Sequence, residues 1–245
     1  MWFMKILIIR HADPDYSIDS LTETGWKEAQ ALTKRLEKLD ISAFYVSPMG
    51  RAQDTASFLL KQKHAEAKIY PWLREFGHRI QKPGEDRLTV PWDWLPEIWT
   101  KEKKYYDLNT WSDTEIFHEA QLPEQYSWVT EGFDEILSHH GYIRDGNCYR
   151  VEQANEDTIV FFCHFGLECV LLSHLLHISP MLLWHGTCVP PASVTTLVSE
   201  ERRKGIAHFR MTAFGDTSHL YAENMEPSFS ARFCETYERH DQRHD

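Results

Sequence analysis

Short apolar runs alternate with longer amphipathic segments along the first part of the chain. Residues 5–9 form a solid apolar run, which predicts a strand buried on both faces. Over about residues 22–39 apolar side chains recur every three or four positions behind a threonine cap, and this period predicts a helix. A second strand is expected at residues 44–46, and a second helix follows the Ser47-Pro48 pair.

The rest of the chain continues this alternation and adds a hairpin. A helix is expected from about residue 130 to a stop at Gly141. The Asp145-Gly146 pair lies between two short β-like runs and predicts a hairpin. The remaining predicted elements are strands at residues 68–70, 158–163, 194–198 and 208–214, and a helix at residues 166–176.

Strands that alternate with helices predict an α/β fold, a three-layer α/β/α sandwich with a mostly parallel central sheet. One domain is expected over residues 1–221, followed by a C-terminal extension or tail over residues 222–245. Residues 76–128, approximately, break the alternation and predict an inserted cap region. Tryptophans concentrated there either pack a small core of the cap or line a substrate pocket. They stand at positions 92, 94, 99, 111 and 128.

The charge balance is acidic, because 26 Lys and Arg stand against 37 Asp and Glu, a formal net charge of −11. Such a surface repels polyphosphate backbones and anionic headgroups, so neither nucleic acid nor a membrane is an expected partner. Five cysteines without a CxxC pair predict neither a disulfide framework nor a zinc site, and we expect a cytoplasmic protein. The apolar run near the start is too short for a signal-peptide core or a membrane span.

Charged side chains follow the predicted strands at the points where the strands end. Arg10 and His11 come directly after the first strand, and His164 comes directly after the strand at residues 158–163. Arg51 lies shortly after the second strand, and Glu75 lies beyond the third. Because ligands of open α/β sheets bind beyond the carboxyl ends of the strands, we expect these five side chains to converge at one edge.

This set of side chains suits phosphoryl transfer. Two guanidinium groups and two imidazoles can clamp a small anion, and the arginines keep His11 neutral and nucleophilic. A carboxylic acid opposite can protonate the departing alkoxide and then activate water. Fixed positive donors stabilise the transferred charge, so we expect neither a metal nor a cofactor. The helical pair His174 and His177 could bind a metal, but no third ligand is evident in the sequence.

Five motifs in order resemble those of the histidine phosphatase superfamily, which includes the phosphoglycerate mutases. The resemblance runs from residue 4 to about residue 215 and leaves the cap and the tail unmatched. The segments that carry it are Arg10-His11-Ala12, the helix start Leu21-Thr22-Glu23-Thr24-Gly25, the stretch Ser47-Pro48-Met49-Gly50-Arg51-Ala52, the triplet Leu73-Arg74-Glu75, and Cys163-His164-Phe165-Gly166.

The resemblance implies a role for each matching residue. His11 would carry the phosphoryl group as the catalytic nucleophile. Arg10 and Arg51 would bind the phosphate, and His164 would hold the phosphoryl group beside His11. Glu75 would be the general acid and base.

Two of these positions leave an alternative open. The usual continuation of the Glu75 motif is absent, so Glu85 or Asp86 of the cap could replace it as the proton donor. Ala12 stands where the family usually has glycine. If that position needs a positive φ or a very close backbone approach, the added methyl group costs roughly 1 kcal/mol.

The segment after the first histidine also departs from the family. Ser17 stands where many members place asparagine, six residues after the nucleophile, and we expect Ser17 to bind phosphate in its place. Asp13 and Asp15 add negative charge beside the pocket. These carboxylates either select a substrate that bears a cation or cap a turn.

The leading hypothesis is a metal-independent phosphatase that hydrolyses a small phosphorylated metabolite through phosphohistidine. One alternative is a phosphoglycerate-type phosphomutase, although the segment after His11 is shorter than in mutases. A second alternative is a non-catalytic regulator that binds a phospholigand on the same fold, suggested by Ala12 and the unusual cap. Carbohydrate binding through the tryptophans is a more distant alternative.

Overall fold

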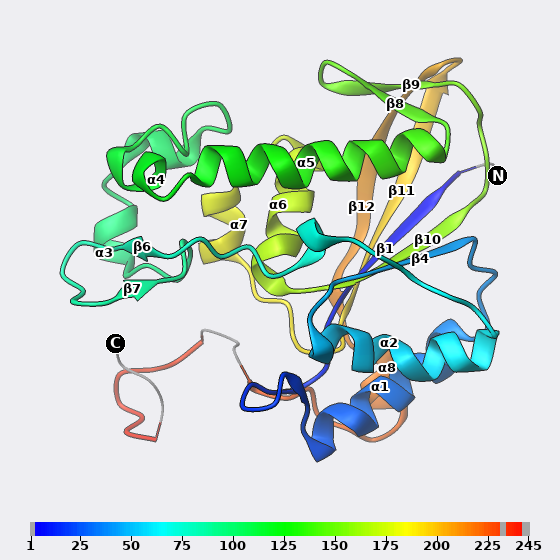
Figure 1. Ribbon diagram of the computed structural model, residues 1–245, viewed down its shortest axis with the longest axis horizontal. Coiled ribbons are helices and arrows are strands. Elements are labelled where there is room, and N and C mark those ends of the chain that lie inside the picture. Colours follow the sequence, from blue (N-terminus) through cyan, green and yellow to red (C-terminus); the bar gives the residue numbers. More distant parts are fainter. Residues whose placement is uncertain (1–2, 231–233, 242–245) are drawn as a thin grey trace.

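A computed structural model describes residues 3–230 and 234–241 and shows one large sheet with helices packed against it (Figure 1). The eight strands, in their order across the sheet, are β5 (Lys68–Ile69), β4 (Ala43–Val46), β10 (Thr158–Cys163), β1 (Lys5–Arg10), β11 (Val194–Arg203), β12 (Ile206–Asp216), β9 (Cys148–Val151) and β8 (Tyr142–Asp145). The α/β sandwich predicted from the sequence is therefore confirmed.

The prediction of a mostly parallel sheet is wrong. β1, β10, β4 and β5 pair in parallel, whereas the four pairings that join β1 through β11, β12 and β9 to β8 are antiparallel. The reason is the connections: helical crossovers return the chain in the same direction, whereas a tight turn reverses it. The Asp145-Gly146 turn joins β8 to β9, and a turn at Gly205 joins β11 to β12, both with glycine at a positive φ. Both hairpins add their strands to the central sheet.

Helices cover both faces of the sheet, and the alternation of side chains along β1 shows why. Ile6 and Ile8 belong to a core shared with α5 (Leu122–His139) and α6 (Phe165–Leu176). Leu7 and Ile9 point into a second core, shared with α1 (Glu23–Leu36) and α2 (Gly50–Lys63). A strand with apolar residues at every position therefore buries both faces, as the apolar run predicted.

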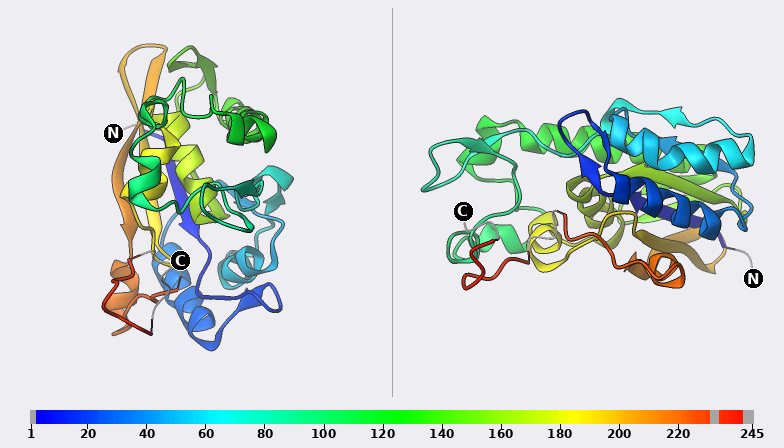
Figure 2. Two further views of the ribbon diagram at one scale, coloured as in Figure 1. Left: turned by 90° about the vertical axis from the view of Figure 1, so that its left-hand side faces the viewer. Right: turned by 90° about the horizontal axis from the view of Figure 1, so that it is seen from below.

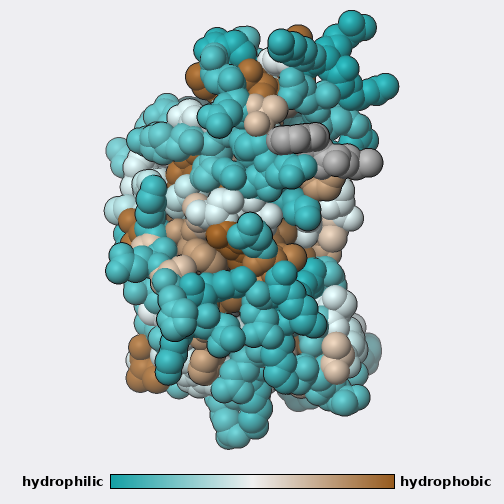
Figure 3. All heavy atoms as spheres, turned by 90° about the vertical axis from the view of Figure 1, so that its right-hand side faces the viewer, coloured by the Kyte–Doolittle hydropathy of each residue, from teal (hydrophilic) through white to brown (hydrophobic). Residues whose placement is uncertain are grey.

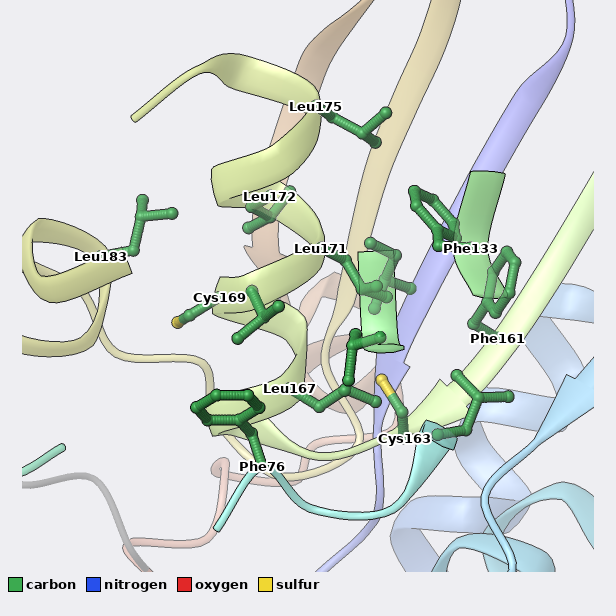
Figure 4. Packing of buried hydrophobic residues seen from close by; sticks show 14 of the residues in the cluster. Phe76, Phe133, Phe161, Cys163, Leu167, Cys169, Leu171, Leu172, Leu175 and Leu183 are labelled. Atoms are coloured by element: carbon green, nitrogen blue, oxygen red, sulfur yellow. The ribbon is translucent and has the colours of Figure 1, made fainter. Parts of the chain in front are cut away.

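The larger core lies between β10 and the helices α5 and α6. Figure 4 shows Leu171 of α6 and Phe133 of α5 on the side of Phe161, which belongs to β10. The rings of Phe133 and Phe161 meet edge to face with their centroids 5.4 Å apart. This packing fixes α6 against the sheet, and its first turn follows directly from the end of β10.

The cap lies beyond α7 (Pro180–Gly186), to the left of the sheet in Figure 1 and in the right-hand view of Figure 2. Trp92, Trp94 and Trp111 are buried and join the larger core, whereas Trp128 lies on α5 and is half exposed. These three buried rings pack the interior. The 3₁₀ helix Pro71–Leu73 precedes the cap, and the elements at the cap are the 3₁₀ helix Lys103–Tyr106, the strands β6 (Ile80–Gln81) and β7 (Leu88–Thr89), and the helices α3 (Pro96–Trp99) and α4 (Glu115–Glu119).

A small hairpin and a final helix complete the described fold. β2 (Pro14–Asp15) and β3 (Ser20–Leu21) pair with each other just after β1, and α8 (Ser218–Ala222) packs against α1. Figure 3 shows the right-hand face of Figure 1, toward which the amino end of β1 points, and its surface is mainly hydrophilic. Within the described residues, no helix is both long enough and apolar enough to cross a membrane.

Candidate active site

The ends of the parallel strands bring the predicted residues to one place. Arg10 is the last residue of β1 and pairs in register with Cys163, the last residue of β10. The backbone N–H of His11 still donates to the Cys163 carbonyl at 3.0 Å, so the two chains leave the sheet side by side. As a result, the rings of His11 and His164 lie with their centroids 5.1 Å apart.

His11 presents a free lone pair on one of its ring nitrogens. Its Nδ1 lies 2.8 Å from the carbonyl oxygen of Ala12, and because a carbonyl only accepts, Nδ1 carries the proton. Burial, and then the charges of Arg10 and Arg51, hold the pKa of His11 well below its usual value. The imidazole is therefore neutral near pH 7, with Nε2 available as a nucleophile.

Ala12 fits its position without backbone strain. Its φ is not positive, and its methyl group packs fully buried in a small apolar cluster with Leu21 and Ala29. Its N–H donates to the hydroxyl of Thr55 at 3.0 Å, and that hydroxyl donates to the Arg51 carbonyl at 2.7 Å. The residue that replaces the family's glycine thus ties the loop after His11 to the helix that carries Arg51.

Arg51 is buried in the first turn of α2 and is held by an acidic partner. Its Nη1 donates to Asp19 Oδ1 at 2.5 Å, and Asp19 Oδ2 accepts the N–H of Gly50 at 2.8 Å. A Cβ on Gly50 would lie 2.2 Å from the Asp19 carbonyl oxygen, so this close approach requires glycine. Above the guanidinium lies the ring of Tyr16, whose centroid is 5.3 Å from Arg51 Cζ.

Arg10 and His164 complete the positive side of the site. The buried Arg10 donates through Nη1 to the carbonyl of Val189, and its guanidinium lies 5.8 Å from the ring of Phe165. His164 is fully buried with Nε2 2.7 Å from the Ser47 hydroxyl, and its Nδ1 has no hydrogen-bond partner in the described parts of the chain. Burial, followed by His11 and the two arginines, lowers the pKa of His164 well below its usual value.

Ser47 lies against one ring nitrogen of His164. Its Oγ accepts the N–H of Met49 at 3.2 Å and lies 2.7 Å from Nε2 of His164. In the tautomer in which the serine hydroxyl donates to Nε2, the ring proton resides on Nδ1. This leaves a buried donor that an incoming oxyanion can use.

Glu75 lies at the amino end of α6. Its Oε1 accepts the N–H groups of Phe76 at 2.9 Å and Leu167 at 3.0 Å. Burial raises its pKa above the usual value, against the lowering effect of these two bonds and the two arginines. A Cβ on Gly166 would lie 2.9 Å from Glu75 Oε1 and 2.5 Å from Trp92 Nε1, so the carboxyl packs directly on the helix backbone.

The alternative carboxylates are engaged within the cap. Glu85 accepts the hydroxyl of Thr89 at 2.9 Å and lies 3.7 Å from the Nζ of Lys82, while Asp86 is exposed. Neither contacts the first turn of α6 as Glu75 does. The geometry favours Glu75 as the acid.

Ser17 is not brought together with the other five predicted residues. It is exposed at the tip of the β2–β3 hairpin, and its hydroxyl donates to Asp15 Oδ1 at 2.5 Å. Asp15 also accepts the N–H of Ser17 and caps the turn, whereas Asp13 accepts the Thr22 hydroxyl at 2.6 Å. The residues of this hairpin that reach Arg51 are Tyr16 and Asp19; sequence reasoning missed both, because no family motif covers them.

A buried carboxylate links the loop after His11 to the C-terminal segment. Glu28 of α1 accepts the N–H of Asp13 at 2.8 Å through one oxygen and the N–H of Ser228 at 3.2 Å through the other. The Ser228 hydroxyl donates to Asp13 as well. Ser228, in the segment expected from the sequence to be a C-terminal extension or tail, therefore supports the loop that follows His11 (Figure 1).

The histidine pair considered for a metal has other partners. His174 Nε2 lies 2.8 Å from Asp134 Oδ2, and His177 Nε2 lies 2.8 Å from the Asn147 carbonyl. Residues 3–230 and 234–241 contain no group of three or more His, Cys, Asp or Glu side chains that could hold a metal ion.

Known proteins resemble this chain in both sequence and structure. A model of the histidine phosphatase superfamily (branch 1) matches residues 6–212. A probable phosphatase of Schizosaccharomyces pombe is 25% identical over 90% of this chain and 97% of its own length. A 2,3-bisphosphoglycerate-dependent phosphoglycerate mutase of Thermoplasma acidophilum is 24% identical over 63% of this chain and 80% of its own. The solved structure of a mycobacterial glucosyl-3-phosphoglycerate phosphatase shares the fold, with a TM-score of 0.57, 17% identity, and coverage of 88% and 100% of the two chains.

Proposed function

This chain belongs to the histidine phosphatase superfamily, and from that premise we propose that it is a metal-independent phosphatase that hydrolyses a small phosphorylated metabolite through phosphohistidine. One observation carries the proposal: the neutral His11, with its Nε2 lone pair, lies beside three groups that can hold an oxyanion. The neighbouring groups are Arg10, Arg51 and His164.

In the first step, His11 Nε2 attacks the phosphorus atom and the bond from phosphorus to the leaving oxygen breaks. The protonated Glu75 gives its proton to that oxygen, so the product leaves as an alcohol. Charge on the three phosphoryl oxygens is held by the two guanidinium groups and by His164 Nδ1–H. These donors are fixed before the substrate arrives, so they stabilise the transition state without reorganising.

In the second step, the ionised Glu75 takes a proton from a water molecule as that water attacks phosphorus. The bond between phosphorus and His11 Nε2 breaks, and the histidine returns to its neutral form. Inorganic phosphate leaves, and Glu75 is again protonated. The raised pKa of Glu75 supports this double role, because an ordinary carboxylic acid would be ionised before the first step.

A phosphomutase is the second candidate, because one similar protein is a phosphoglycerate mutase. A mutase must keep the phosphoryl group on its histidine until that group returns to the same substrate skeleton. A phosphatase instead lets water attack the phosphohistidine. The two reactions therefore differ in mass balance. Release of inorganic phosphate indicates the phosphatase, and an isomerised phosphate ester indicates the mutase.

The direct test is hydrolysis of p-nitrophenyl phosphate by the full chain in excess chelator. We expect the wild type to release phosphate and His11→Ala to lose at least about three orders of magnitude in kcat/KM, because the nucleophile is gone. His139→Ala, which removes an exposed histidine from the last turn of α5, is the matched control. Activity retained in His11→Ala would refute the mechanism.

A further inference from the structure

Tyr16 stands over the site from the tip of the β2–β3 hairpin. Its side chain is 61% exposed, yet its ring lies on the guanidinium of Arg51, with 5.3 Å between the ring centroid and Cζ. Stacking on an arginine held in the phosphate clamp is a specific placement for an exposed aromatic side chain.

The phenol of Tyr16 keeps its proton at neutral pH. Desolvation is the strongest influence and raises its pKa, while the charges of Arg10 and Arg51 lower it. Tyr16 therefore carries a hydrogen-bond donor on a side chain whose ring lies over the guanidinium of Arg51.

The hairpin holds Tyr16 in this place from both sides. Asp15 accepts the backbone N–H of Ser17 at 3.0 Å together with its hydroxyl, so the serine is turned to the hairpin itself. On the other side, Asp19 grips Arg51 and the N–H of Gly50. A side chain anchored by its neighbours in this way loses little further entropy when it contacts a ligand.

We propose that Tyr16 contacts the substrate: its phenolic O–H donates a hydrogen bond to a phosphoryl oxygen, and its ring closes the site over Arg51. The inference rests on the proposed function and adds a residue that no family motif marks. It also moves to Tyr16 the phosphate-binding role expected for Ser17. The substrate class is a phosphate monoester whose phosphoryl group lies beneath the ring of Tyr16.

The test compares Tyr16→Phe and Tyr16→Ala in the full chain. Losing a hydrogen bond to a charged oxygen should raise KM for p-nitrophenyl phosphate about tenfold in Tyr16→Phe, with a smaller change in kcat. Tyr16→Ala also loses the ring and should be weaker still. Tyr221→Phe and Tyr221→Ala, at a tyrosine of α8 that is 56% exposed, are the matched controls and should behave as wild type.

A second measurement separates this inference from the proposed function. The dissociation constant of inorganic phosphate can be measured without turnover. It should rise about tenfold in Tyr16→Phe. A wild type that binds phosphate without hydrolysing the ester contradicts the proposed function, and the phosphate affinities of the variants still decide the role of Tyr16.

Three outcomes would overturn the inference. One is wild-type affinity for phosphate and wild-type KM in Tyr16→Phe. Another is a loss in Ser17→Ala as large as that in Tyr16→Phe, which would return the contact to Ser17. The third is the absence of phosphate binding by the wild type. Thermal unfolding of each variant shows whether the fold is intact, and the exposed position of Tyr16 predicts little change.

Discussion

The two halves of the sheet serve the site in different ways. The parallel strands β4, β10 and β1 end in functional side chains, at Ser47, His164 and His11. The segment directly before β11, the first antiparallel strand, supplies backbone groups. The Val189 carbonyl accepts from Arg10, and the Ala192 N–H donates to the His11 carbonyl at 3.2 Å. Parallel strands bring all their carboxyl ends to one edge, so side chains distant in sequence meet there. Antiparallel strands alternate in direction and act here as a support.

The largest effect is expected where a clamp arginine of the parallel half is removed. Arg51→Ala should lower kcat/KM for p-nitrophenyl phosphate by about a thousandfold, because a buried, fixed positive donor to the phosphoryl oxygens is lost. Arg202→Ala, on the exposed end of β11 in the antiparallel half, should change it less than twofold. Equal losses in both variants would remove the functional difference between the two halves.

The next effect concerns the acid at the amino end of α6. Glu75→Gln should lower kcat about a hundredfold or more with an alkyl phosphate, whose leaving oxygen needs a proton. With p-nitrophenyl phosphate the loss in the first step should be smaller, because that leaving group departs as an anion. Glu85→Gln is the control within the cap. If Glu85→Gln falls as far as Glu75→Gln, the proton donor has been assigned to the wrong carboxyl.

The pH profile sharpens the same assignment. The pKa of His11 is lowered by burial and the arginines, so the acid limb of kcat/KM should lie well below pH 6.5. The pKa of Glu75 is raised, so activity should fall on the alkaline side as this acid ionises, at a pH above the usual range of glutamic acid. Glu75→Gln should abolish the alkaline limb, and a limb that persists would belong to another group.

The smallest effect concerns stability and a carboxyl that faces the antiparallel half. Glu168 of α6 is fully buried near Thr195 of β11, and burial raises its pKa from 4.5 to about 8. A raised pKa means that the folded chain holds this proton more tightly, so its stabilisation is complete below the unfolded pKa and is lost as the pH rises toward 8. Glu168→Gln should therefore raise Tm by roughly 5 °C at pH 8.5 and by little at pH 5.

Glu131→Gln, at an exposed position of α5, provides the comparison for that measurement. It should leave the dependence of Tm on pH unchanged, because folding does not remove this side chain from water. A pH dependence in Glu168→Gln identical to that of the wild type would contradict the assignment of the buried proton.

Much of the site could be predicted because its residues directly follow strands. The apolar runs located the ends of β1 and β10, and the parallel pairing of these two strands places His11 beside His164. The hairpin after β1 could not be predicted in the same way. Neighbouring residues of a short turn point in different directions, and a sequence pattern does not show that Ser17 turns to Asp15 while the ring of Tyr16 lies over Arg51.

Two larger features also lay outside the reach of local patterns. A hairpin signal predicted the antiparallel pair β8–β9, and two closing strands were expected near β11 and β12, but local patterns did not predict that these four strands join the central sheet as antiparallel neighbours. The tryptophans of the cap were expected either to form a separate small core or to line a pocket, whereas Trp92, Trp94 and Trp111 pack into the main one. Both outcomes depend on contacts between distant segments.

The contact between Asp13 and Ser228 joins positions 215 residues apart. A ribosome makes the loop that carries Asp13 well before Ser228, so this support can form only once the chain has extended past Ser228. His11 is thus synthesised long before its loop gains this anchor. Chains that stop short of Ser228 would present His11 on a loop that lacks one of its anchors.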